Sequence, residues 1–333
     1  MQGMMRGIMS NFAHQQQNLD SFVADSVGWP SNKWDDFVIN WKYRDVLKML
    51  QKSRSHIDNV LHNHLNCNKQ SIPYSYLLGF KTREPKMDGP TRKNLLSSIT
   101  FFIKNADKTQ VCLAPRAFSD CLRFFSENYK GQNQNVNIQL IHYLKKSIEL
   151  LQNTNKNILT CAHADLMYCC VKTYCYNQAF PIIEQDIIEV QGNGCVRALD
   201  NLRYHYYCGL IYIGVKKYRK ALESLSMVCT SPSESLSVYQ IEAYKKYVLI
   251  SLILNRKLVN LPRYTPRILT RYFSKFCNEY QELAAKFSGK KDVLGFGGLS
   301  SLYSMMDDVD DGKMDTDMND VNNNNNNNES KND

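Results

Sequence analysis

Apolar side chains recur along most of this chain at the three- and four-residue intervals of an α-helix. One example runs from Ile141 through Leu144 and Ile148 to Leu151, in steps of three, four and three. A longer run of this kind predicts a single helix with a sustained apolar seam. Its members are Leu269, Phe273, Phe276, Tyr280, Leu283 and Phe287. No segment alternates apolar and polar residues with a period of two, so the pattern predicts helices and no sheet-based fold.

Residues 202–264 are predicted to form two helical hairpins in succession. Gly209 and Ala221 supply small side chains where one helix approaches another, and Tyr212 and Tyr218 fill the space between the helices. This order of residues is typical of a tetratricopeptide-type unit, which cannot bury its apolar face without neighbours. We therefore predict an all-α fold, a superhelical stack of antiparallel helix pairs.

Interruptions of the pattern divide the chain. Residues 1–33 are rich in Met, Gln and Asn and are predicted to be a flexible N-terminal segment, followed by a helical-repeat region over residues 34–200. Prolines, glycines and charges are concentrated in residues 66–93, which predicts a long connection within the helical array. After a glycine-rich linker at 295–298, the chain becomes acidic and contains a run of seven Asn. Residues 291–333 are therefore predicted to be disordered.

The charge of the chain is distributed unevenly. Residues 307–333 contain nine acidic residues and two lysines, a net charge of −7, whereas the whole chain carries +9. The remaining residues therefore carry +16. A basic body with an acidic tail is typical of proteins that contact nucleic acid or an acidic protein partner. It also fits a solvated helical surface without a single patch, which is the interpretation we favour for the densest run, KKYRK at 216–220.

The chain contains eleven cysteines but no Cys-x-x-Cys pair, and its N-terminus lacks the continuous apolar stretch of a secretory signal. It also has no run of about 18 apolar residues that would predict a membrane-spanning helix. Scattered cysteines of this kind are typical of reduced thiols in the cytoplasm or the nucleus. Their spacing predicts no zinc cluster.

Candidate catalytic groups are few. His62 and His64 are spaced as in a zinc isopeptidase motif, but Ser75 occupies the position where that motif requires Asp. Cys161 and His163 are a conceivable nucleophile and base, although no third group is in view to orient them. A histidine beside apolar positions is more often a packed, hydrogen-bonded residue. We therefore predict no enzymatic activity, no metal and no cofactor.

Tyrosines crowd the two hairpins and leave two interpretations open. Most of them are expected to pack within the repeats. Some are expected to form an interface with a protein partner, because large aromatic and cationic side chains are favoured in such contacts. The predicted partner-contact residues are Tyr206, Tyr244, Lys245, Lys246, Tyr247, Arg263 and Tyr264. Aromatic rings interleaved with Lys and Arg also suit base stacking, so the alternative is a nucleic-acid-binding helical adaptor.

Several long segments resemble a known family, and their order and spacing match as well. They are AHADL at 162–166, YHYYCGLIYIGVKKYRKAL at 204–222, EAYKKYVLISLIL at 242–254, LPRYT at 261–265 and NEYQELA at 278–284. These segments resemble the third-subunit family of the COP nine signalosome. Weaker similarity extends back to HIDNVL at 56–61 and LDSFV at 19–23.

The resemblance implies a non-catalytic scaffold whose partners are the other signalosome subunits and, indirectly, cullin-RING ubiquitin ligases. Such a subunit supports removal of the modifier NEDD from cullins and thereby ubiquitin-dependent protein degradation, in the cytoplasm and the nucleus. In this family the helical repeats lead into a PCI module, a helical layer capped by a winged helix. Residues 201–290 are then the helical part of a PCI-like module. No winged-helix strand pattern follows LSSLY at 299–303, so we expect the fold to be truncated before that subdomain.

Overall fold

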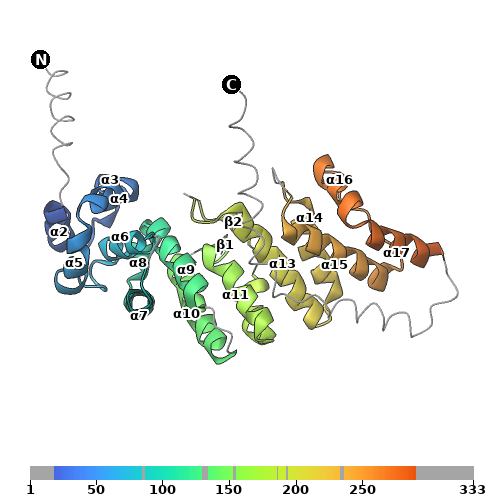
Figure 1. The fold of residues 1–333 in the computed structure, drawn as a ribbon, viewed down its shortest axis with the longest axis horizontal. Coiled ribbons are helices and arrows are strands. Elements are labelled where there is room, and N and C mark those ends of the chain that lie inside the picture. The colour runs from blue at the N-terminus through green and yellow to red at the C-terminus, as the bar shows by residue number, and fades with distance from the viewer. Residues whose placement is uncertain are drawn as a thin grey trace, which may run out of the picture. The chain divides into compact units, whose positions relative to one another are not determined.

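The computed structural model describes residues 19–289 apart from short gaps at 85–86, 130–133, 153–154, 186, 193 and 233–235. The tail predicted to be disordered, the linker at 295–298 and the segment at 299–303 lie outside the described residues. Figure 1 shows the described helices and strands, coloured along the chain. Contacts divide the chain into two units, residues 1–204 and 205–333, and each is described by itself. The border between these units falls inside a helix and does not test the border that we predicted between residues 200 and 201. That border stays a prediction.

Short helices open the first unit: α2 (Leu19–Gly28), α3 (Trp34–Asn40), α4 (Tyr43–Lys52), the 3-10 turn η1 (Arg54–His56) and α5 (Ile57–Asn63). Part of the segment that we predicted to be flexible, residues 1–33, is therefore helical. The reason is aromatic packing, because the ring of Phe22 is fully buried and lies 5.1 Å from that of Trp41. The Trp41 indole also donates a hydrogen bond of 2.9 Å to Asp25.

The long connection predicted over residues 66–93 is wrong, because the central helix α6 (Ser71–Lys81) lies within it. Every residue of α6 from Ser71 to Phe80 is buried, so the sequence shows no polar stripe to reveal a helix. Pro73 occupies the first turn, where backbone N–H groups have no partner within the helix. The N–H of Ser71 instead donates to the side-chain oxygen of Gln110 at 2.8 Å.

The helices that follow α6 in the first unit are α7 (Gly89–Asn105), α8 (Lys108–Leu113), α9 (Pro115–Tyr129), α10 (Gln134–Gln152), α11 (Cys161–Lys172), η2 (Tyr176–Gln178) and α12 (Phe180–Ile183). Helix α6 packs against α9, and α10 packs against both α11 and α8. Two-residue strands β1 (Ile158–Leu159) and β2 (Glu189–Val190) form a parallel pair beside them. Among the described residues, this two-stranded pair is the only sheet, and all the other elements are helices. The predicted all-α, helical-repeat fold is therefore confirmed.

Helix α13 (Ala198–Gly214) crosses from the first unit into the second, which continues with α14 (Tyr218–Thr230) and α15 (Val238–Asn255). The predicted close approach at Gly209 is present. A Cβ atom on this glycine would lie 2.8 Å from Cδ2 of Leu225, a fully buried side chain of α14. Ala221 is also fully buried, so small and large side chains interlock between these two helices as the repeat pattern predicts.

The single helix predicted from Leu269 to Phe287 is wrong. The structure has two helices, α16 (Arg267–Phe276) and α17 (Asn278–Gly289), because Cys277 between them adopts ψ of 26°. Each helix buries its own residues, Leu269 and Phe273 in α16 and Ala284 in α17. Phe276, which the predicted seam required to be covered, is 51% exposed. The regular apolar spacing in the sequence therefore ran across residues that belong to two separate helices.

Candidate interaction surfaces

Four of the predicted contact residues are buried inside the second unit. Tyr206, Tyr244, Lys246 and Tyr247 are at most 6% exposed. The ring of Tyr244 stacks on Phe273 of α16, with centroids 4.3 Å apart and planes 1° from parallel. Burial raises the pKa of Tyr247 to about 12. These side chains hold α15 to its neighbours, so the packing interpretation accounts for them in this structure and the interface interpretation does not.

The two adjacent lysines of α15 share one carboxylate. The ammonium of Lys245 lies 2.6 Å from one oxygen of Glu242, and that of Lys246 lies 3.5 Å from the other. Burial lowers the pKa of Lys245, but the hydrogen bond to Glu242 and the charges of Glu242 and neighbouring groups together outweigh it, so the pKa is raised overall. The ammonium of Lys246 also lies 5.6 Å from the ring centre of Tyr206. Both lysines are therefore engaged in contacts inside the second unit.

Arg263 and Tyr264 are placed differently, because both lie in the exposed turn between α15 and α16. The side chain of Tyr264 is 72% exposed. The structure does not bring these two residues together with the buried tyrosines as one face. Their role as partner contacts stays a prediction.

Sequence reasoning missed a surface that begins at Arg267, three positions after Tyr264. Along α16 basic and apolar side chains alternate at a spacing of four, which places each kind in a line along the helix. The basic line is Arg267, Arg271 and Lys275, and the apolar line is Ile268, Tyr272 and Phe276. We call these six residues the α16 strip. The spacing was visible in the sequence, but Phe276 had been assigned to the buried seam.

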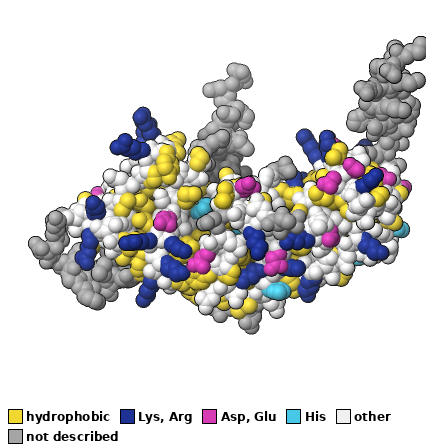
Figure 2. All heavy atoms as spheres, turned by 180° about the vertical axis from the view of Figure 1, so that it is seen from behind, with side chains coloured by type: hydrophobic (Ala, Val, Ile, Leu, Met, Phe, Trp, Pro, Cys, Tyr) yellow, Lys and Arg dark blue, Asp and Glu magenta, His cyan; other side chains and the backbone are white. Residues whose placement is uncertain are grey.

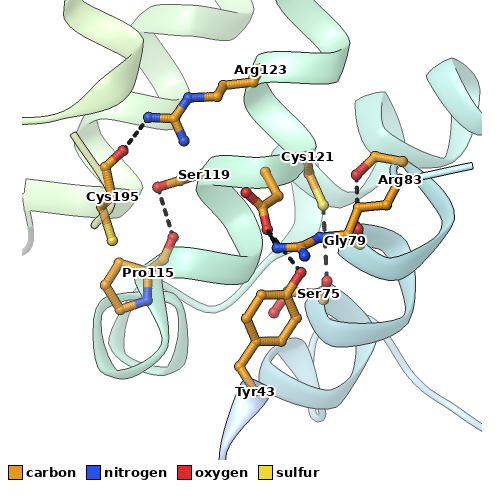
Figure 3. A network of polar contacts seen from close by, with 11 residues as sticks. Tyr43, Ser75, Gly79, Arg83, Pro115, Ser119, Cys121, Arg123 and Cys195 are labelled. Atoms are coloured by element: carbon orange, nitrogen blue, oxygen red, sulfur yellow. Dashed lines mark hydrogen bonds and ion pairs between the residues drawn. The ribbon is translucent and has the colours of Figure 1, made fainter. Parts of the chain in front are cut away.

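A second feature that sequence reasoning missed is a polar network in the first unit (Figure 3). Arg83, just after α6, donates to the Asp120 carboxylate of α9 at 2.6 Å, and the Tyr43 hydroxyl of α4 donates to the same oxygen at 3.1 Å. Burial, and secondarily the Asp120 carboxylate, raises the pKa of Tyr43 far above its ordinary value, so the hydroxyl remains a donor. Gly79 permits this arrangement, because a Cβ atom there would lie 2.5 Å from the Tyr43 hydroxyl oxygen.

The network continues along α9 to the start of α13. Arg123 donates to the Cys195 carbonyl (Figure 3). It also donates, at 2.7 Å, to the Asp200 carboxylate. Asp200 also accepts the backbone N–H of Arg197 at 2.9 Å, which closes the first turn of α13. A cleft of about 370 Å³ lies over the network. Its lining comprises Thr82, Arg83, Arg116, Asp120, Arg123, Phe124, Glu127, Gly194 and Arg197.

The arginines of this cleft do not form an open anion site. The Arg123–Asp200 pair is largely buried, with exposed side-chain fractions of 13% and 11%, and Arg83 is paired with Asp120. Paired charges at low exposure fix the relative position of the segments that carry them. The network therefore holds the region before α13 against α9, and its chemistry is structural.

The conceivable nucleophile pair, Cys161 and His163, does not have catalytic geometry. His163 caps the start of α11, where its Nδ1 accepts the backbone N–H of Thr160 at 3.0 Å. Burial lowers the pKa of His163 to about 4 and raises that of Cys161 to about 12. Asp165 pairs with Arg203 at 2.9 Å and is committed elsewhere. The thiol is therefore protonated and the imidazole supports the helix cap.

The described part of the chain has no group of three or more His, Cys, Asp or Glu side chains arranged to hold a metal ion. His62 and His64 are exposed at the end of α5. Among the described residues no helix is both long and apolar enough to cross a membrane.

Comparison with known proteins identifies the family. A family model described as the N-terminal helical repeats of COP9 signalosome complex subunit 3 matches residues 33–269. The chain belongs to this family. It is 30% identical over 272 residues to COP9 signalosome complex subunit 3 of Dictyostelium discoideum, which covers 81% of this chain and 62% of that protein. The identity to the Arabidopsis thaliana protein of the same name is also 30%, over 68% of this chain and 51% of the relative. The chain thus spans between half and two thirds of the length of these curated relatives.

Proposed function

We propose that this chain is a non-catalytic scaffold subunit of a COP9 signalosome. Its helical body provides surfaces to which other subunits of that complex bind, and residues 201–290 serve as the helical part of a PCI-like module. Through the assembled complex the chain supports cullin deneddylation and so regulates cullin-RING ubiquitin ligases and ubiquitin-dependent degradation. It acts in the cytoplasm and the nucleus.

The observation that carries this proposal is the family match over residues 33–269. The structure provides a physical basis for the scaffold role, because the matched region is built of helices that pack against nearby helices of the chain, such as α10 against α11 and α14 against α15. Arrays of this kind expose extended surfaces, which suits them to binding proteins. The chemistry of the candidate catalytic groups supports a non-catalytic role, since Cys161 is a buried, protonated thiol and His163 is part of a helix cap.

The alternative, a nucleic-acid adaptor with a Tyr-rich surface, is disfavoured by burial. Base stacking requires exposed ring faces, but Tyr206, Tyr207, Tyr239, Tyr244 and Tyr247 are all at most 6% exposed. The basic side chains are also dispersed. Figure 2 shows Lys and Arg side chains interspersed with hydrophobic and acidic ones on the face in view.

Affinity capture of the full chain from cells, followed by mass spectrometry, tests the proposal. We expect recovery of the other signalosome subunits, and we expect them to remain bound at raised salt, because salt screens exposed charge pairs but not buried apolar contacts. A Gly209→Leu variant, which disturbs the α13–α14 packing, should recover less of them than a Gly89→Ala variant, whose added Cβ meets no atom within 4 Å. Recovery of nucleic acid that falls steeply with salt, without signalosome subunits, would support the adaptor instead.

A further inference from the structure

The α16 strip is an exposed surface with two chemical characters. Ile268 is 45% exposed and Phe276 is 51% exposed, and the three basic residues of the strip are exposed as well. The opposite side of α16 is committed, because Leu269 and Phe273 are each only 1% exposed. The helix carries no acidic residue, so its three positive charges have no acidic side chain on the same helix. A fitting ligand therefore has negative charges and apolar side chains in close succession.

The chain itself contains such a segment. Residues 305–321, MMDDVDDGKMDTDMNDV, combine seven aspartates and one lysine with interspersed Met and Val. We propose that this acidic segment binds the α16 strip of the same molecule. Its aspartates pair with Arg267, Arg271 and Lys275, and its Met and Val side chains cover Ile268 and Phe276. The interaction goes beyond the proposed function and does not depend on it.

The distances permit binding within one molecule. Helix α17 packs against α16, and its 12 residues span about 18 Å at 1.5 Å per residue. Residues 290–306 separate the end of α17 from the first aspartate in the sequence, and a random-coil chain of this length would have a root-mean-square span of about 20–25 Å. Such a chain would give an effective concentration on the order of 1 mM. A segment that binds with Kd of about 100 μM would therefore be bound about nine-tenths of the time.

The interaction should depend on ionic strength, because exposed charge pairs weaken as salt screens them.

A fluorescent peptide of residues 305–321 tests the proposal, with its binding measured by fluorescence anisotropy. Two full-length chains are compared as receptors: the unmodified chain, and a variant in which the seven aspartates of residues 307–320 are replaced by asparagine so that its α16 strip stays open. We expect this variant to bind the peptide about tenfold more tightly than the unmodified chain, whose own segment competes. Equal binding by the two chains, or no binding by either, would overturn the proposal.

A charge-reversal pair provides the matched control. Arg267→Glu with Arg271→Glu, introduced into the asparagine variant, should weaken peptide binding at least tenfold. Lys217→Glu with Arg219→Glu changes the net charge equally within the densest basic run and should leave binding within twofold. Equal weakening by both pairs would show general charge attraction and contradict a specific site. Should the α16 variant fold poorly by circular dichroism, a peptide with its aspartates replaced by asparagine tests the same contact on an intact helix.

Carbodiimide cross-linking of the unmodified chain gives a second readout. Lys275 should link to an aspartate of residues 307–320, and a mixture of isotopically light and heavy chains should yield the link within single chains. Links between light and heavy chains would mean that the strip binds a second copy, which contradicts the proposal. Absence of any link from Lys275 to the segment would contradict it as well.

Discussion

Replacement of Gly209 by leucine should destabilise the second unit strongly. Gly209 lies where α13 meets α14, and an added Cβ would be 2.8 Å from Cδ2 and 2.9 Å from Cγ of Leu225. Carbon atoms in contact prefer separations of about 3.5–4.0 Å. Leu225 is fully buried, as are Ala221 and Val228 on the same helix, so it has no free space into which to move.

The magnitude follows from two opposing effects. Overpacking a filled core costs about 1–3 kcal/mol, and leucine adds three carbons beyond the Cβ that already overlaps. Replacing glycine inside a helix returns about 1 kcal/mol of backbone propensity. Because leucine lies at the upper end of the overpacking range, we expect a net loss of about 2 kcal/mol for leucine and of less than about 1 kcal/mol for alanine. At about 2–4 °C per kcal/mol, the leucine variant should melt about 4–8 °C lower.

Urea and thermal unfolding followed by circular dichroism measure this effect. A Gly89→Ala variant is the control, because its added Cβ meets no atom within 4 Å, and its stability should change by less than about 0.5 kcal/mol. Combining Gly209→Leu with Leu225→Ala should cost at least about 1 kcal/mol less than the sum of the two single changes, since the alanine makes room. Unchanged melting of Gly209→Leu, or full additivity of the pair, would refute the proposed contact.

Three further changes test other parts of the structure. Asp200→Asn leaves Arg123 buried without its carboxylate and should lower the free energy of unfolding by about 3 kcal/mol in urea titrations; a loss below about 0.5 kcal/mol would mean that the pair is not formed. Thr160→Ala removes the cap of α11 and should lower the free energy of unfolding by about 1 kcal/mol; Thr173→Ala, at the other end of that helix, is the comparison. The pKa of His163 is about 4 when folded and ordinarily 6.5, so the unfolded state binds more protons between these values. Stability should therefore fall as pH falls from 6.5 to 4, and His163→Gln should reduce this slope; an unchanged slope would contradict burial of the imidazole.

The sequence was sufficient for the helical architecture, because amphipathic helices and small residues at close contacts are local features. The position of Gly209 opposite α14 followed from the repeat pattern alone. Helix α6 could not be recognised in the same way. Its residues are buried on every side, and the Gln110 side chain that satisfies its first N–H is 39 positions away from Ser71.

The interaction surfaces were predicted less well, for a related reason. A segment rich in tyrosine and lysine has the same composition whether its side chains fill a core or form an interface. Which of the two occurs depends on the neighbouring helices. Tyr244 is covered by Phe273 of α16, a contact between residues 29 positions apart that no local pattern reveals. Likewise, the network around Asp120 joins α4, α6 and α9, and its members share no spacing in the sequence.

Assembly with other signalosome subunits is the central claim, and reconstitution measures it most directly. The full chain should be mixed with the remaining subunits of a signalosome lacking its third subunit, and the mixture separated by size-exclusion chromatography at low and raised salt. We predict that the chain elutes with the other subunits in a one-to-one ratio at both salt concentrations. Elution of the folded chain as a separate peak under both conditions would contradict the account.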